Sequence, residues 1–341
     1  MPVKEIKEIK GFKLTFGKKH YYFCGAEPPI NTVTSCRFCK NKYITNRFLE
    51  AAEIPVPKAT IIEKNELTND QFLKSLKHLK YPLVVKPGTE AKGKDVFCNL
   101  QTIEDVRAAL TEVFATYDWV IVEEFHAHLS SYRVLVFNQR ILGVIKRYPA
   151  HVIGDGTHTI EELITQTNKE RKKINEFLAP IALDQEAYIA LREQELNIDY
   201  IPKVSQKINL GYTSNASRGG TYETLSKRIC KENRKLMIHV ANVLGLELIG
   251  IDVECNNINI PITYGNGVVI EANFNPSVRI HELPISGPSN LVTRKIIRSL
   301  IYRHPLAYLC SLYFNKQTAF YIRSFIVAII IAMILPLLAK G

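Results

Sequence analysis

The stretch Gly267–Pro284, GVVIEANFNPSVRIHELP, joins a short apolar run to a set of side chains that carry oxygen atoms. The β-branched residues 268–270 predict a buried strand. Glu271 and Asn273 follow two residues apart, so on an extended backbone their side chains leave on the same face. Together they can offer oxygen ligands to a hard cation such as Mg2+.

A second apolar run, LELIGIDVE at 246–254, carries another carboxylate, Asp252. If the two runs pair as antiparallel strands, Asp252 comes to lie opposite Glu271. Proteins usually hold Mg2+ with one or two carboxylates while phosphate and water fill its other positions. Asp252, Glu271 and Asn273 therefore predict a Mg2+ site that binds a nucleotide. The alternative is two strand ends whose polar side chains face water.

Length and composition describe a globular chain. Its 341 residues, 46% hydrophobic and 23% charged, suffice for roughly two or three domains. The net charge of +11 is spread along the chain, which argues against a nucleic-acid-binding arm and suits an anionic ligand or an anionic membrane surface. The scattered cysteines and the absence of a signal-peptide pattern predict a reducing compartment. The sequence predicts no particular oligomeric state.

The N-terminal segment, residues 1–40, contains a cysteine cluster. Cys36 and Cys39 form a C-x-x-C pair, and Cys24 and His20 precede it. Four such ligands suit tetrahedral zinc, although the spacing of the first two is irregular. Zinc, an iron–sulfur centre, a redox pair and ordinary reduced cysteines all remain as interpretations.

One lysine and two arginines are further candidates for binding phosphate or carboxylate groups. Lys86 ends the strand in YPLVVKPGTEAKGKDVF (81–97) and faces the glycine-bearing loop 88–94, where it can hold a phosphate while the loop closes over others. A glycine-rich surface turn is the alternative. The segment SYRVLVFNQRILGVIKR (131–147) predicts a hairpin turning at residues 138–139. Arg133 and Arg147 then stand on paired strands, where they can bind phosphate or carboxylate.

Ten motifs in one order extend this pattern over about residues 40 to 300. They are NKYIT with Lys42, IPVP, VVKP with Lys86, the loop glycine Gly93, VEEF, YRVLV, the segment Arg147–Ile164, NASRGG, GID and EANFNP. Together they resemble the ATP-grasp amide ligases, in particular the ATP-grasp domains of cyanophycin synthetase and bifunctional glutathione synthetase. No single motif is specific, whereas ten in register are.

The resemblance implies how ATP is held. Lys42 and Lys86 would grip its phosphates, and the loop around Gly93 would close over them. The strand end at 123–125 would hold adenine through Glu123, Glu124 and Phe125. Relatives commonly carry Asp or Glu just before the Tyr-Arg pair as a ribose contact. Here Ser131 stands at that position, and its hydroxyl can still hydrogen-bond.

The resemblance also implies the catalytic groups. Arg133, Arg147 and Arg218 would lie near the transferred phosphoryl group or the acceptor carboxylate. His281 lies where these relatives approach the substrate. The metal ligands would be Asp252, Glu271 and Asn273, carrying two Mg2+ ions, in agreement with the spacing argument.

The C-terminal segment is strongly apolar. Residues 325–338, FIVAIIIAMILPLL, carry no charge, and the apolar run extends back to Ala319 with only Arg323 inside it. About 20 residues suffice to cross a bilayer. We therefore expect a transmembrane helix over 317–340, with the catalytic part on the cytoplasmic side because basic residues precede the span. A buried C-terminal helix is the alternative, since the uncharged core is short and contains Pro336.

The expected fold is thus an α+β ATP-grasp fold with a C-terminal transmembrane helix. The expected domains are the N-terminal segment 1–40, an ATP-grasp domain at 41–305 with a flap subdomain at about 75–140, and the helix at 317–340. The expected activity uses ATP and Mg2+ to activate an amino-acid or peptide-like carboxylate as an acyl phosphate and join it to an amine, releasing ADP and phosphate. The alternatives are a kinase-like phosphoryl transfer and a membrane-tethered nucleotide-binding module without turnover.

Overall fold

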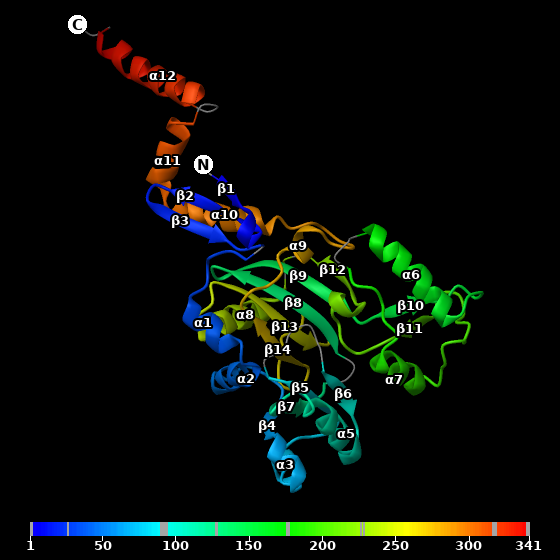
Figure 1. Cartoon of the computed structure of the whole chain (residues 1–341). Helices are drawn as coiled ribbons and strands as arrows, with labels where there is room; N and C mark the ends of the chain where they lie inside the picture. The colour runs from blue at the N-terminus through cyan, green and yellow to red at the C-terminus, as the bar shows by residue number, and fades with distance from the viewer. Residues whose placement is uncertain are drawn as a thin grey trace. The chain divides into compact units, whose positions relative to one another are not determined.

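The computed structural model describes residues 3–25, 27–88, 95–126, 129–174, 178–225, 227, 229–315 and 319–338 (Figure 1). The chain forms two compact units. Unit 2 comprises Asn31–Pro276 and Ile280–Asn290, and unit 1 comprises Met1–Ile30, Ser277–Arg279 and Leu291–Gly341.

A five-stranded sheet forms the centre of unit 2. Every neighbouring pair in it is antiparallel, and the strand order is β12 (Thr221–Leu225), β9 (Arg140–Tyr148), β8 (Ser130–Phe137), β13 (Leu248–Cys255) and β14 (Gly267–Asn273). Asp252 pairs with Glu271, which confirms the predicted register. The β8–β9 hairpin turns at Asn138 and Gln139, as predicted, and both have positive φ.

One face of this sheet is covered by helices α2 (Lys42–Ala51) and α8 (Lys231–Val243). Leu49 of α2 and Met237 of α8 are fully buried among the apolar side chains of β8 and β13. Asn41 caps α2 by accepting a hydrogen bond from the amide of Ile44. Lys42 is the first residue of α2, so the cap and the packing of the helix together fix its position.

A second sheet belongs to the same unit. Its order is β4 (Ala59–Glu63), β7 (Trp119–Glu124), β5 (Leu83–Pro87) and β6 (Phe97–Leu100), and it packs with α3 (Lys64–Thr68), α4 (Phe72–Leu76) and α5 (Ile103–Val113). β5 is buried along its whole length because it lies in the interior of the sheet under helix α5. Lys86 is consequently a cation on an interior strand.

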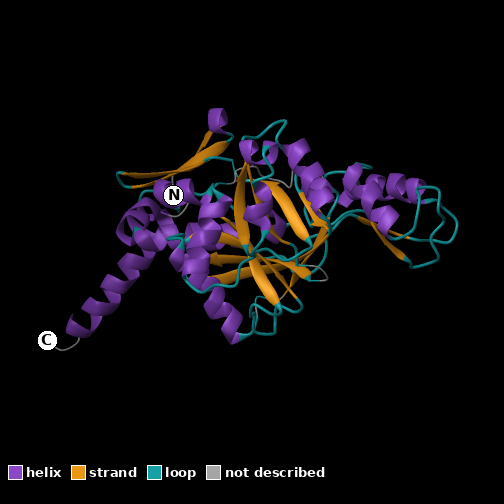
Figure 2. Cartoon of the chain, turned by 90° about the horizontal axis from the view of Figure 1, so that it is seen from below, coloured by secondary structure: helices purple, strands orange, loops and turns teal. Residues whose placement is uncertain are grey.

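A smaller cluster between residues 150 and 210 completes unit 2. The two-stranded ribbon of β10 (His151–Ile153) and β11 (Lys207–Asn209) packs with α6 (Ile160–Ile174) and α7 (Gln185–Glu193) around its own apolar core. Figures 1 and 2 both show these elements side by side. The chain then passes through the short helix η2 (Ala216–Arg218) back to the large sheet.

Unit 1 combines the two ends of the chain. It contains the sheet of β1 (Val3–Ile6), β2 (Gly11–Phe16) and β3 (Lys19–Phe23) and the helices α10 (Val292–Arg303), α11 (Pro305–Tyr313) and α12 (Ala319–Leu338), and α11 contacts β2. His304, between α10 and α11, stacks on Phe16, and its Nε2 lies 2.7 Å from the hydroxyl of Tyr21.

Helix α12 occupies the segment for which we expected a transmembrane helix. Across the described residues, no helix is long and apolar enough to cross a membrane. After Arg323 the uncharged part of α12 is about 22 Å long, against roughly 30 Å of hydrocarbon. The prediction of a span at 317–340 is therefore not supported. The buried-helix alternative is not supported either, because side chains such as Phe325 and Met333 are exposed.

The cysteines show no sign of a metal centre. Cys36 and Cys39 lie on α1 (Val33–Cys39), and all seven cysteines are free. Within the described parts of the chain, no three His, Cys, Asp or Glu side chains lie close enough to hold a metal ion. Burial raises the pKa of Cys39 to about 12, which keeps it a protonated thiol. The zinc and iron–sulfur interpretations are therefore not supported.

Candidate active site

Side chains from both sheets of unit 2 line one cavity of about 210 Å³, which we call the inner cavity. It brings together most of the residues singled out from the sequence, although they come from seven different strands or helices. The members of the predicted set that line it are Lys42, Lys86, Glu123, Glu124, Phe125, Ser131, Arg133, Arg147, Asp252, Glu271 and Asn273.

Asp252 lies at the centre of this cavity. It pairs with Arg133 across β8 and β13, and the guanidinium donates from Nε to Oδ1 at 2.6 Å and from Nη2 to Oδ2 at 2.7 Å. Arg147 adds a bond from Nη1 to Oδ2 at 3.1 Å. Burial alone would raise the pKa of Asp252, but the two arginine charges and their hydrogen bonds outweigh burial and lower it. Asp252 is therefore held as a carboxylate.

Whether the predicted metal ligands suit Mg2+ can be judged from the oxygen atoms that they bring to the cavity. Asp252, Glu271 and Asn273 line the same cavity and supply two carboxylates and an amide. The amide nitrogen of Asn273 lies 3.3 Å from Oδ2 of Asp252, which leaves its oxygen as a ligand. These hard donors fit Mg2+, which takes oxygen ligands. Asp252 already accepts hydrogen bonds from two arginines, so a cation bound there would share the carboxylate with them or replace one of their contacts.

Two lysines line the cavity, one from helix α2 and one from strand β5. Lys42, at the start of α2, lies 3.7 Å from Oε1 of Glu271, and its amide donates to the carbonyl of Gly88 at 3.1 Å. Lys86 on β5 forms a buried ion pair with Glu123 on β7. Two cations thus reach the region of the predicted metal ligands. The predicted loop 88–94 and its Gly93 lie, beyond Gly88, outside the described residues.

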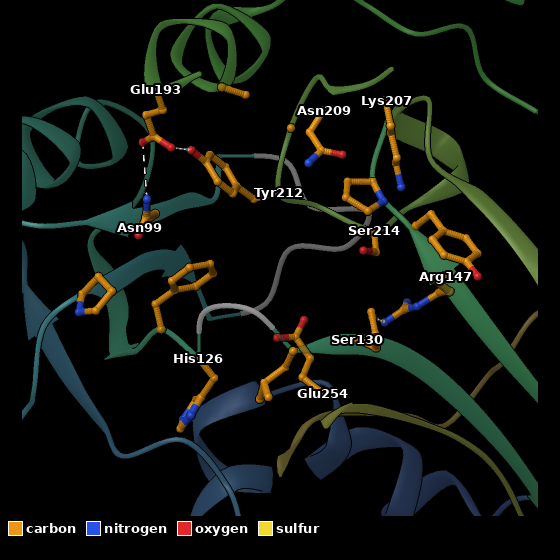
Figure 3. Close-up of a pocket in the computed structure, with 18 of the residues that line it drawn as sticks. Asn99, His126, Ser130, Arg147, Glu193, Lys207, Asn209, Tyr212, Ser214 and Glu254 are labelled. Carbon is orange, nitrogen blue, oxygen red and sulfur yellow. Dashed lines mark hydrogen bonds between the residues drawn. The ribbon is translucent and has the colours of Figure 1, made fainter. Parts of the chain in front are cut away.

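A larger cavity of about 800 Å³, the outer cavity, adjoins the inner one (Figure 3). Its wall carries polar side chains from β6, α7 and β11, and Lys207 lies over the ring of Tyr148 at 5.2 Å. Among the residues that the structure describes, seven line both cavities: Phe125, His126, Ser131, Arg147, Tyr212, Ser214 and Glu254.

Glu254 is a site residue that sequence analysis missed. It stands two residues after Asp252 on β13, so both side chains leave on the same face of the sheet. That spacing was the available signal. Burial raises the pKa of Glu254 to about 7, while the charge of Arg147 partly offsets this. Figure 3 shows its carboxylate pointing into the outer cavity.

Arg218 and His281 line neither cavity. Arg218 pairs with Asp184 at 2.7 Å and with Glu186 at 2.9 Å, because η2 lies next to the acidic start of α7. His281, in the short helix α9 (Arg279–Glu282), is fully buried against Gly143 of β9. Burial lowers its pKa to about 3, so the ring is neutral. The structure therefore does not bring these two predicted catalytic residues to the cluster.

Comparisons with known proteins identify the type of domain. Residues 39–177 match the RimK-like ATP-grasp domain. The chain is 35% identical over 257 residues to cyanophycin synthetase of Synechocystis sp., covering 72% of this chain and 28% of that protein. It is 32% identical over 263 residues to the glutathione biosynthesis bifunctional protein GshAB of Listeria monocytogenes, covering 76% of this chain and 33% of that protein.

A solved structure shows the same fold. The bifunctional glutathione synthetase from Pasteurella multocida aligns with a TM-score of 0.61 at 26% identity, over 89% of this chain and 41% of that chain. The chain spans about a third of the length of the curated relatives that it matches. The sheet that carries Asp252 and Glu271 is therefore part of an ATP-grasp α+β fold, and this chain carries a RimK-like ATP-grasp domain.

Proposed function

We propose that the protein is an ATP-dependent carboxylate–amine ligase that forms an amide or peptide bond through an acyl phosphate. The observation that carries this proposal is the convergence of two lysines, two arginines and the Asp252, Glu271 and Asn273 trio on one cavity. The relatives cyanophycin synthetase and the glutathione biosynthesis protein are named for syntheses, which supports the same class of reaction.

The phosphate end of ATP belongs at the two lysines. Phosphoryl transfer depends mainly on positioning and on neutralising charge, and Lys42 and Lys86 supply two cations there. Mg2+, when held by Asp252, Glu271 and Asn273, neutralises further phosphate charge. If Mg2+ were to take the place of an arginine at Asp252, that guanidinium would be available to bind the incoming substrate carboxylate.

The reaction then follows from the placement of these groups. An oxygen of the bound carboxylate attacks the γ-phosphorus of ATP, and the bond to the β-phosphate oxygen breaks, which gives ADP and an acyl phosphate. An amine attacks the acyl carbon next and phosphate leaves, carrying the negative charge while the nitrogen loses its proton. Closure of residues 88–94 over the site, which keeps water from the acyl phosphate, stays a prediction.

The substrates that we propose are an amino-acid or peptide-like carboxylate and an amine. The test is a screen of amino acids and short peptides for substrate-dependent ADP release, with hydroxylamine added to trap the activated acid as a hydroxamate. We expect negligible ATP consumption without a carboxylate and hydroxamate formation with the correct one. A stable phosphorylated product without amide would instead establish the kinase-like alternative.

We also propose that the catalytic residues face the cytoplasm and that α12 associates with a membrane. The support for the membrane contact is the exposure of large apolar side chains along α12, among them Phe325, Ile330 and Met333. The basic residues of α10, such as Arg298, suit an anionic lipid surface.

A further inference from the structure

The inner and outer cavities meet at a waist whose walls are the seven residues common to both. The inner side of the waist holds the lysines and the trio of oxygen ligands. The strand end at Phe125 and His126 is part of the waist, and Pro82 lies on its outer side. A nucleotide with its phosphates at the lysines and its base at that strand end places its ribose between them, beside the other residues of the waist.

Glu254 is the acidic residue among these seven. Its neighbour across the β13–β8 ladder is Ser131, and directly opposite residues in an antiparallel pair have Cβ atoms about 5 Å apart. Both side chains line the two cavities, so they leave on the same face of the sheet. A carboxylate at 254 and a carboxylate at 131 would therefore reach the same part of the waist.

The hydrogen bonds of the neighbouring polar side chains are compatible with a ribose contact by Glu254. Arg147 donates from Nη2 to the Ser131 hydroxyl at 3.0 Å and from Nη1 to Asp252 at 3.1 Å. The Ser131 hydroxyl thus already accepts one hydrogen bond, and it is small and uncharged. A ribose presents two adjacent hydroxyl groups, and a carboxyl side chain, with its two oxygen atoms, can hydrogen-bond to both. Ser131 cannot do so, whereas Glu254 can.

We propose that Glu254 binds the ribose hydroxyls of the nucleotide and does so in place of an acid at position 131. This inference rests on the proposed function, because it requires a nucleotide in the inner cavity. It makes Glu254 a specificity residue that distinguishes ribonucleotides from deoxyribonucleotides. It also explains how a chain with serine at 131 can retain a carboxylate at the ribose.

The experiment compares Mg–ADP with Mg–2′-deoxy-ADP by titration calorimetry on the full chain. We expect the wild type to prefer the ribonucleotide by at least about tenfold, corresponding to 1.4 kcal/mol. Glu254→Ala should reduce that preference to near unity while the affinity for 2′-deoxy-ADP stays similar. Glu254→Gln, which keeps the shape, should reduce the preference in the same direction and serves if the alanine variant does not fold.

Two further variants sharpen the test. Glu193→Gln changes an acid that lines the outer cavity only, so the preference should remain as in the wild type. The double variant Ser131→Glu/Glu254→Ser moves the carboxylate to the opposite strand and should restore the preference that Glu254→Ala loses.

The outcomes distinguish a failure of the ribose role from a failure of the proposed function. If the wild type binds ADP and Glu254→Ala keeps the full preference for the ribonucleotide, the ribose role is wrong and the proposed function stands. If the wild type binds neither nucleotide, the proposed function fails and the ribose role fails with it.

Discussion

The substitution Lys86→Met separates the structural and ligand-binding roles of a buried lysine. Lys86 and Glu123 are 8% and 5% exposed and form an ion pair between β5 and β7. Removal of the lysine leaves Glu123 as a buried charge without its partner. Breaking a buried pair in this way costs about 3–5 kcal/mol, because the remaining carboxylate keeps its desolvation penalty. We expect the free energy of unfolding to fall by that amount.

The second effect is on nucleotide binding. If Lys86 contacts a phosphate, Lys86→Met should weaken Mg–ATP binding at least tenfold, or about 1.4 kcal/mol. The double variant Lys86→Met/Glu123→Gln tells the two effects apart. Its pair is neutral, so most of the lost stability should return, while the affinity for Mg–ATP should stay low.

The assays are urea unfolding for stability and titration calorimetry for affinity. Lys74→Met, which changes an exposed lysine of α4, is the matched control and should alter neither quantity. Equal affinity of the wild type and Lys86→Met for Mg–ATP would refute the phosphate contact. An unchanged free energy of unfolding in Lys86→Met would refute the argument from the buried pair.

Three further predictions concern other parts of the molecule. Glu271→Gln should lower substrate-dependent ATP turnover by about a hundredfold or more, because it removes a charged ligand from the predicted metal site. Little stability should be lost, because a third of the Glu271 side chain is exposed. Unchanged turnover would exclude Glu271 from the metal site. His281 is buried with its pKa lowered to about 3, so the unfolded chain takes up a proton below pH 6.5 and the folded chain does not. Between pH 6.5 and pH 5 the wild type should lose about 1.6 kcal/mol more stability than His281→Leu, as measured by urea unfolding; parallel losses would contradict this. A chain ending at Asn315 should shift from the membrane to the supernatant fraction relative to the full chain, and equal partitioning would count against membrane association by α12.

Local features of the chain were predictable from the sequence alone. The β-branched run before Glu271 and the two-residue spacing to Asn273 depend only on the alternation of side chains along a strand. The turn at Asn138 and Gln139 follows from an asparagine, which tolerates positive φ, between two β-forming runs. The pairing of Asp252 with Glu271 was also accessible, because the two runs are consecutive strands and consecutive strands commonly lie side by side in a sheet.

The convergence of distant segments was decided by the tertiary structure. That Arg133 and Arg147 both bind Asp252, and that Glu254 stands opposite Ser131, depends on the register between β8 and β13, whose residues are more than a hundred positions apart. A register shift of one residue would turn these side chains to the other face of the sheet, and no local pattern specifies it. Arg218 carries the same charge as Arg133, yet helix packing placed it beside Asp184. The sequence thus determined which chemical groups are available, whereas strand register and packing decided which of them meet.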